Sequence, residues 1–280
     1  MGICDSLWYH DNMRTFTALH GTIPVLLHVP HAGLESFLDS SDIETGAIAK
    51  EMTTMADLNT DWIARLASSA MDGSPYLLQS HMTRMECDVE RYPDDREEMN
   101  KVGMGVIYSL GMQGADDGLY TEKPPKRVMD HRLEALYKPY HRMFGSMVRE
   151  MVGRFGFAVI IDVHSYAKDP LPYELHSDAD RPEICIGVNN DADENMVRDI
   201  IIGGEKHGRR WSYGFNTVFR GAITPEGMGD DPRVHSVMLE FRKDTYMSGG
   251  IPMYADMDAL GEAISRLSSE MTRILGSVKA

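Results

Sequence analysis

Short apolar runs alternate along this chain with longer segments of helical periodicity, and this alternation limits the possible folds more than any other feature. Strands that alternate with helices predict an α/β fold, in which a mixed, mostly parallel sheet carries helices on both faces. The predicted strands lie in 22–33, 74–91, 157–162, 183–190 and 234–247, and the predicted helices lie in 40–71, 128–156, 195–212 and 255–278.

Several residues mark where these helices begin, bend or end. Ser41 and Asp42 are N-cap candidates for the first helix. Pro139 is expected to break or kink the second helix, which then ends near Gly153 or Gly156. The sequence contains neither an internal repeat nor a low-complexity linker. We therefore expect a single α/β hydrolase domain over 1–280, with a long loop insertion around 92–126 that is functional or mobile.

Charge and cysteine content restrict the partners and the compartment. A net charge of -15 over 280 residues disfavours binding to nucleic acid or to an anionic membrane. The three cysteines, Cys4, Cys87 and Cys185, include no C-x-x-C pair, which argues against a disulfide framework and a cysteine zinc site. Neither a signal peptide nor an apolar run of roughly 20 residues is evident. We expect a cytoplasmic protein, either a monomer or a small homo-oligomer.

Polar residues stand at the ends of two predicted strands. Asp162 and His164 close the run GFAVIIDVHSY, and His31 follows VLLHVP. Sites in open α/β sheets form at the carboxyl ends of strands, and residues two apart on a strand share a face. Two histidines and one carboxylate are the ligands of a catalytic zinc ion, which activates water. The alternative, histidines that only hydrogen-bond within the fold, stays open at this point.

Seven segments, in order along the chain, resemble the N-formylglutamate amidohydrolase family. The resemblance implies a fold similar to zinc carboxypeptidases and to aspartoacylase, and one Zn²⁺ ion. It also implies a small-molecule substrate, N-formyl-L-glutamate or a similar N-acyl acidic amino acid, that is hydrolysed in histidine breakdown. The segments are PHAG (30–33), LNTDW (58–62), CDVER (87–91), KPYH (138–141), IDVHS (161–165), NTVFRG (216–221) and MLEFRKDTYM (238–247).

The resemblance implies that His31 and His164 are metal ligands. The related aspartoacylases carry His-x-x-Glu, but this chain has leucine at that glutamate position, and Glu35 lies one residue later. Asp61 matches an acid of the family and is the expected third ligand, with Glu35 as the alternative. Asp57 precedes Asp61 by one helical turn and is expected to lie behind it.

Two further acids are expected to act in catalysis. Glu240 lies within the apolar run VMLEF, where burial would raise its pKa and suit it to act as a general base. Its alternative role is that of a solvent-facing acid on an edge strand. Asp162 is expected to orient an imidazole or the attacking water. A nucleophilic role for Ser165 is disfavoured because no G-x-S-x-G motif surrounds it. His28 is expected to belong to the core or to support the ligands.

Three arginines are expected to bind the carboxylates of the substrate. Arg91 resembles the arginine of the D-x-N-R motif of related enzymes, and guanidinium binds carboxylate bidentately. The asparagine of that motif is replaced by Glu90 in this chain. Arg84 and Arg220 are further candidates, and Arg242 is an alternative to Arg220.

Two other functions remain open on the sequence. One is a zinc hydrolase that acts on another N-acyl amino acid or on a small peptide, for which Glu90 and the segment LPYELHSDADRPE give room. The other is a non-catalytic metal or ligand sensor on the same fold. Loss of turnover on replacement of Glu240 would distinguish an enzyme from such a sensor.

Overall fold

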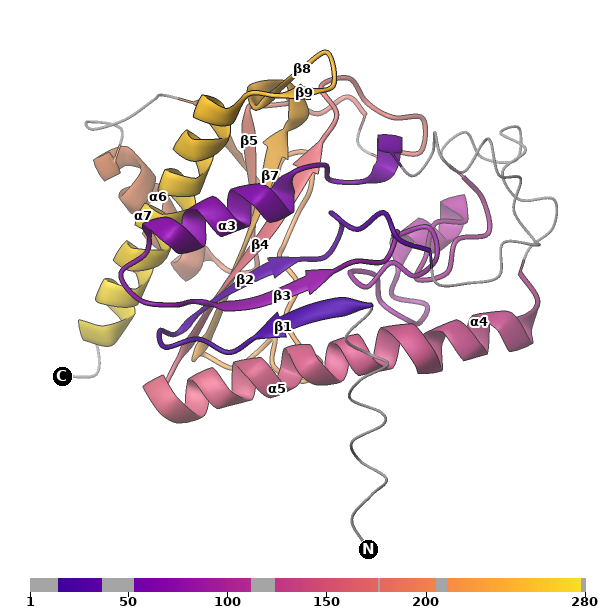
Figure 1. Ribbon diagram of the computed structural model, residues 1–280, viewed down its shortest axis with the longest axis horizontal. Helices are drawn as coiled ribbons and strands as arrows, with labels where there is room; N and C mark the ends of the chain where they lie inside the picture. The colour runs from indigo at the N-terminus through magenta and orange to yellow at the C-terminus, as the bar shows by residue number, and fades with distance from the viewer. Residues whose placement is uncertain (1–14, 37–52, 112–123, 176, 205–210, 278–280) are drawn as a thin grey trace, which may run out of the picture.

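The computed structural model describes residues 15–36, 53–111, 124–175, 177–204 and 211–277. Its centre is a seven-stranded sheet in the order β1-β3-β2-β4-β7-β5-β6 (Figure 1). The strands are β1 (Phe16–Leu19), β2 (Val25–Val29), β3 (Tyr76–Ser80), β4 (Ala158–Tyr166), β5 (Ile184–Val188), β6 (Tyr213–Phe215) and β7 (Val234–Arg242).

Most neighbouring strands of this sheet run parallel. β3, β2, β4 and β7 are parallel to one another, and β6 is parallel to β5. β1 is antiparallel to β3, and β5 is antiparallel to β7. The predicted mixed, mostly parallel sheet is confirmed. The sequence pattern did not predict β1, β6 or the hairpin of β8 (Met247–Ser248) and β9 (Ile251–Pro252), which are all very short.

Helices cover both faces of the sheet, as predicted (Figure 1). The alternation of β2 side chains separates two cores: Leu27 packs on one face and Leu26 on the other. The first face carries α3 (Thr60–Ala70), α6 (Asp191–Gly204) and α7 (Tyr254–Ser277). The second face carries α5 (Lys138–Phe155). The carboxyl ends of β2, β4 and β7 therefore lie between two helical layers.

The predicted helix over 40–71 is interrupted in the structure. Residues 53–55 form a helical turn, and α3 begins at Thr60 after a break. Asn59 has φ 66°, in the left-handed region that asparagine tolerates better than most residues. This break frees the side chain of Asp57 from the face of a helix. Ser41 and Asp42, the predicted N-caps, lie outside the described residues.

The predicted helix over 128–156 bends without breaking. α4 (Lys126–Arg132) continues through a π-helical turn (Leu133–Tyr137) into α5, and Pro139 lies in the first turn of α5. A proline at a helix start needs no amide hydrogen, so Pro139 does not break the path. Gly156, with φ 83°, ends α5. None of the helices in the described part of the chain has the length and apolarity needed to cross a membrane.

The predicted loop insertion around 92–126 is described only in part. Its residues 92–111 contain one short 3₁₀ helix, η2 (Glu98–Val102), and its last residues precede α4. The residues at 112–123 lie outside the described part.

His141 on α5 holds the segment that carries Arg91. Its Nε2 atom donates a hydrogen bond to the carbonyl oxygen of Val89 at 2.7 Å. The ring stacks on Tyr137, with centroids 4.0 Å apart. Burial lowers the pKa of His141 from 6.5 to about 4, although the bond to Val89 opposes this change. The ring is therefore neutral at neutral pH.

We expect His141 to make the protein less stable in acid. Between pH 6.5 and pH 4 the unfolded chain binds a proton at this histidine and the folded chain does not, so stability is complete above pH 6.5 and falls toward pH 4. The loss from this group amounts to about 3 kcal/mol. Urea unfolding at pH 7 and pH 4.5 should show a smaller loss in His141→Gln, which keeps a donor for Val89. Equal losses in both proteins would contradict the assignment.

Candidate active site

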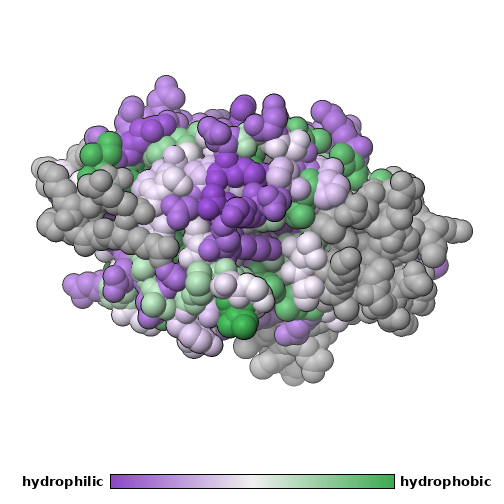
Figure 2. Space-filling model, turned by 90° about the horizontal axis from the view of Figure 1, so that it is seen from above, coloured by the Kyte–Doolittle hydropathy of each residue, from purple (hydrophilic) through white to green (hydrophobic). Residues whose placement is uncertain are grey.

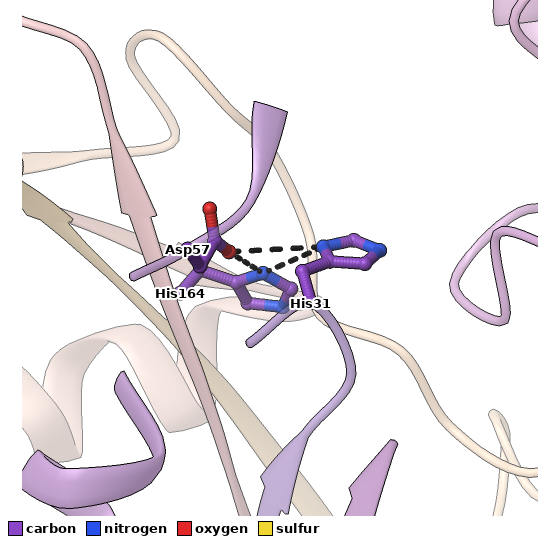
Figure 3. Close-up of side chains that lie close together, drawn as sticks. All are labelled: His31, Asp57 and His164. Carbon is purple, nitrogen blue, oxygen red and sulfur yellow. Dashed lines mark hydrogen bonds and ion pairs between the residues drawn. The ribbon is translucent and has the colours of Figure 1, made fainter. Parts of the chain in front are cut away.

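Two histidines and one carboxylate converge at the carboxyl ends of the central strands (Figure 3). His31 follows β2, His164 lies in β4, and Asp57 lies in the break before α3. The Nδ1 atoms of His31 and His164 are 3.2 Å apart. Asp57 Oδ2 lies 3.1 Å from Nδ1 of His164 and 3.7 Å from Nδ1 of His31. The prediction that these two histidines meet in space is confirmed.

The backbone around His31 explains why this side chain is held firmly. The amide of Asp57 donates to the carbonyl of His31 at 2.9 Å, which ties the two segments together. Beyond His31, a Cβ on Gly33 would lie 2.3 Å from the carbonyl carbon of His81, so only glycine fits. The amide of Glu35 donates to His81 at 2.9 Å. The PHAG turn is thus fixed between β2 and the segment after β3.

Acidic groups lie against the outer nitrogen of each histidine. His31 Nε2 bonds to Asp88 Oδ1 at 2.8 Å, and His164 Nε2 lies 3.0 Å from Asp162 Oδ1. A carboxylate behind an imidazole fixes the ring and leaves the other nitrogen free to bind a metal. Asp88 stays ionised: burial opposes its charge, but Arg84 and His31 outweigh burial and hold its pKa well below the usual range. Asp162 thus lies beside His164, and its orienting role stays a prediction.

The three converging atoms fit a divalent metal ion. Zinc ligands at about 2.0–2.1 Å in a tetrahedron lie about 3.3 Å from one another, which matches the 3.1 to 3.7 Å observed here. Burial opposes ionisation of Asp57, but hydrogen bonds and charge from His164 and His31 lower its pKa, so it is a carboxylate. Two imidazoles and one carboxylate, all buried and at the wall of one cavity, form a donor set of the catalytic zinc type.

The structure brings Asp57, rather than Asp61, to the two histidines. Asp61 lies on α3, about one third of its side chain is exposed, and its nearest ion-pair partner is Arg65 at 3.9 Å. Glu35, the alternative third ligand, is exposed. The sequence-based choice assumed one continuous helix through both aspartates. The break before α3 turns only Asp57 inward, so Asp57 replaces Asp61 as the candidate ligand.

Glu240 faces the same site from the neighbouring strand. In the β4–β7 register it pairs with His164, and both line a cavity of about 400 Å³. Only 7% of Glu240 is exposed, and its Oε2 atom has no hydrogen-bond partner among the described residues. Burial raises its pKa to about 8: the charge of His164 opposes this rise, and the charges of Asp57 and Glu90 add to it. Hydrophilic residues gather near the middle of the face seen in Figure 2, toward which β4 and β7 run.

The three predicted arginines line this cavity in different states. Arg84 is bound to Asp88 Oδ2 through Nε and Nη2, at 3.1 and 2.9 Å. Arg91 is held more loosely, with Nε 3.5 Å from the same oxygen. Arg220 is exposed and has no ion pair to another described residue. Arg242, the alternative, pairs with Asp244 at 2.6 Å and does not line the cavity. Arg91 and Arg220 are therefore the arginines available to a ligand.

Glu90 introduces a further carboxylate beside the histidines. Its Oε1 lies 3.0 Å from Nε2 of His164, and its Oε2 lies 3.6 Å from Nδ1 of His31. Burial, and then the charge of Asp162, raise its pKa. The cavity wall thus carries the carboxyl group of Glu90 in addition to the three arginines.

Two residues that sequence reasoning missed hold the segment around Asp57. Lys243 Nζ donates to the carbonyls of Thr54 and Ala56 at 3.0 and 2.7 Å. The hydroxyl of Tyr246 donates to the carbonyl of Leu58 at 2.8 Å. Both follow Glu240 in the run EFRKDTYM, and a lysine and tyrosine so soon after a buried glutamate were the available signal. The end of β7 therefore supports Asp57 as well as presenting Glu240.

Ser165 also contacts the cluster. Its Oγ donates to Asp57 Oδ1 at 3.3 Å. This bond places the hydroxyl behind the candidate ligand, in a supporting position and not in that of a nucleophile.

Comparison with known proteins matches this chain to one family. The model of the N-formylglutamate amidohydrolase family matches residues 23–247. Two similar proteins are both named N-formylglutamate deformylase. The one from Pseudomonas putida is 26% identical over 232 residues, covering 81% of this chain and 83% of its own. The one from Pseudomonas aeruginosa is 26% identical over 262 residues, covering 91% and 93%.

The fold is shared with a solved member of that family. The crystal structure of N-formylglutamate amidohydrolase from Ralstonia eutropha JMP134 matches with a TM-score of 0.72 at 18% identity. The match covers 95% of this chain and 98% of that one. At this identity the likeness shows the fold, and the site must be argued from the residues of this chain.

Proposed function

The chain belongs to the N-formylglutamate amidohydrolase family, a family of amide hydrolases, and from this premise we propose that it hydrolyses N-formyl-L-glutamate to formate and glutamate. The observation that carries the proposal is the convergence of His31, His164 and Asp57 in a cavity that Glu240 also lines. We further propose that these three side chains hold one Zn²⁺ ion. When bound, the ion would supply Lewis-acid activation of a water molecule and of the amide carbonyl.

Glu240 is proposed as the general base and then the general acid. It would accept a proton from the attacking water, whose oxygen forms a bond to the formyl carbon. It would then donate that proton to the leaving nitrogen as the carbon–nitrogen bond breaks. A pKa of about 8 suits both steps, since a group that accepts and returns a proton works best near the ambient pH.

Arg91 and Arg220 are proposed to bind the two carboxylates of the substrate. Both line the cavity, and neither is saturated by a close bidentate partner among the described residues. Arg84 is bound by Asp88 and Tyr108, and we assign it the role of fixing Asp88 behind His31. The acidic charge and the cysteine content support a cytoplasmic location.

Metal removal is the direct test of this function. We expect the purified protein to contain about one equivalent of zinc by elemental analysis. Chelation should abolish formate release from N-formyl-L-glutamate, and added Zn²⁺ should restore it. Circular dichroism of the chelated protein serves as the control for folding. Full activity in a protein shown to be free of metal would disprove the proposal.

A second substrate class is favoured by one observation. Glu90 places a carboxylate within 3.0 Å of His164, where it would repel a substrate carboxylate and accept hydrogen bonds from a neutral group. A related zinc hydrolase for another N-acyl amino acid or a small peptide fits that charge. Comparing N-formylglutamate with N-formyl derivatives of neutral amino acids separates the two: a higher kcat/KM for neutral substrates would favour this second class.

A further inference from the structure

A chain of buried polar side chains leads from His164 into the core of the protein. His28 Nδ1 is 2.7 Å from Asp162 Oδ1, and the same oxygen is 3.0 Å from His164 Nε2. The other ring nitrogen of His28 is 2.8 Å from the hydroxyl of Tyr140. His28, Asp162 and Tyr140 are completely buried, and none of them lines the cavity.

We propose that His28 is a positioning residue, which holds Asp162 so that this carboxylate fixes the ring and the tautomer of His164. His28 touches neither the substrate nor the candidate metal ligands directly, and it acts through Asp162. The inference rests on the proposed metal-dependent function, because it concerns how one of the proposed ligands is presented.

Asp162 decides how its two neighbouring histidines face it. A carboxylate only accepts hydrogen bonds, so Nδ1 of His28, which faces Asp162, carries a proton. The other ring nitrogen, Nε2, makes its hydrogen bond with the hydroxyl of Tyr140. The same Oδ1 of Asp162 lies 3.0 Å from Nε2 of His164, close enough for its charge to favour a proton on that nitrogen. A proton on Nε2 leaves Nδ1 of His164 with its lone pair directed toward His31 and Asp57.

The fold holds His28 in one orientation. In the parallel β2–β4 register, His28 lies directly beside Asp162. Its ring stacks on Phe144 of α5, with centroids 4.8 Å apart and planes 2° apart. Tyr140 reaches His28 from the same helix and is packed edge-on against Phe16. α5 thereby supports the proposed metal site through two side chains that never reach it.

The surroundings of His28 favour this role over simple packing. The sheet positions two residues before His28 and Asp162 on the same face are Leu26 and Ile160, both fully buried and apolar. A polar pair among such neighbours is tolerated only when its hydrogen bonds are made, and an apolar pair would fill the space without that requirement. The hydrogen bond to Asp162 therefore explains why a histidine stands at this position.

The test measures Zn²⁺ affinity of the purified, metal-stripped protein by competition with a chromophoric chelator, beside kcat and KM. We expect His28→Leu to weaken Zn²⁺ binding by about 10- to 100-fold and to lower kcat with little change in KM. His28→Asn keeps a donor near the Nδ1 position and should recover most of the loss. Tyr140→Phe, which removes only one hydroxyl, should give a smaller loss and guards against a His28 variant that fails to fold.

Leu26→Ala is the matched control, because it removes packing from the same face of the same strand without touching a polar group. It should lower stability and leave Zn²⁺ affinity near that of the original protein. Two results would overturn this inference and leave the proposed function standing. One is an unchanged Zn²⁺ affinity and kcat in folded His28→Leu and Tyr140→Phe. The other is an equal loss of Zn²⁺ affinity in Leu26→Ala and His28→Leu. A chain that binds Zn²⁺ at this site but releases no formate would overturn only the proposed function. A chain that binds no metal would overturn both.

Discussion

Glu240→Gln is expected to lower formate release by at least 10²-fold, and by up to about 10⁴-fold, while the protein keeps its metal. The amide of glutamine has nearly the shape of the carboxyl group but cannot accept and return a proton. Glu240 lines the cavity and pairs with His164 in the β4–β7 register, so little else should change. Removal of a buried carboxyl whose Oε2 has no hydrogen-bond partner among the described residues should not lower stability. Steady-state kinetics and elemental analysis measure the two quantities.

Glu98→Gln is the matched control for this prediction. Glu98 is exposed and lines the same cavity, so its replacement removes one negative charge from the wall without touching the histidines. Its kcat should stay within a few-fold of the original. Loss of turnover in Glu98→Gln equal to that in Glu240→Gln would indicate a general charge effect. Retained turnover in Glu240→Gln would remove Glu240 from the mechanism.

The second large effect is expected at Asp57. Asp57→Asn removes the only anionic atom among the three converging donors, and we expect Zn²⁺ affinity to fall by at least about 100-fold, with activity lost at micromolar metal. Asp57 Oδ2 is close enough to both histidine nitrogens to share a metal ion with them, at 3.1 and 3.7 Å. Asparagine has the same size but a much weaker oxygen ligand. Calorimetric titration of the metal-free protein with Zn²⁺ gives the affinity.

Asp61→Asn provides the comparison within the same segment. It makes the same chemical change four residues later, on a side chain that points toward Arg65. Its metal affinity and activity should match those of the original protein. The reverse result, metal lost with Asp61→Asn and kept with Asp57→Asn, would restore Asp61 as the ligand and contradict the arrangement seen here.

The periodicity of apolar residues predicted much of the fold, and the elements that it missed or misplaced each have a local cause. Long apolar runs such as 157–162 and 234–247 predicted the central strands, because a strand buried on both faces must be apolar throughout. β1 and β6 have only four and three residues, too few for a pattern to emerge. The prediction of one helix over 40–71 was wrong at the break before Thr60. Asn59 has a left-handed backbone conformation there, and the spacing of apolar side chains gives no sign of it.

The candidate site divides in the same way. The sequence by itself determined that His31 and His164 stand at strand ends, and because parallel strands end at the same edge of a sheet it predicted that they would meet, as they do. It also determined that Glu240 would be buried, since apolar residues surround it in β7.

Only the tertiary structure decided which aspartate completes the cluster and what stands behind His164. Asp57 and Asp61 are four residues apart in the sequence, and the break before α3 separates them: Asp57 lies beside the histidines and Asp61 beside Arg65. His28 finds Asp162 across the register of two strands 134 residues apart, and Tyr140 reaches it from α5. Such contacts depend on how elements pack against one another. Packing between segments far apart in the sequence produces no periodic pattern in either segment, so the sequence pattern does not predict it.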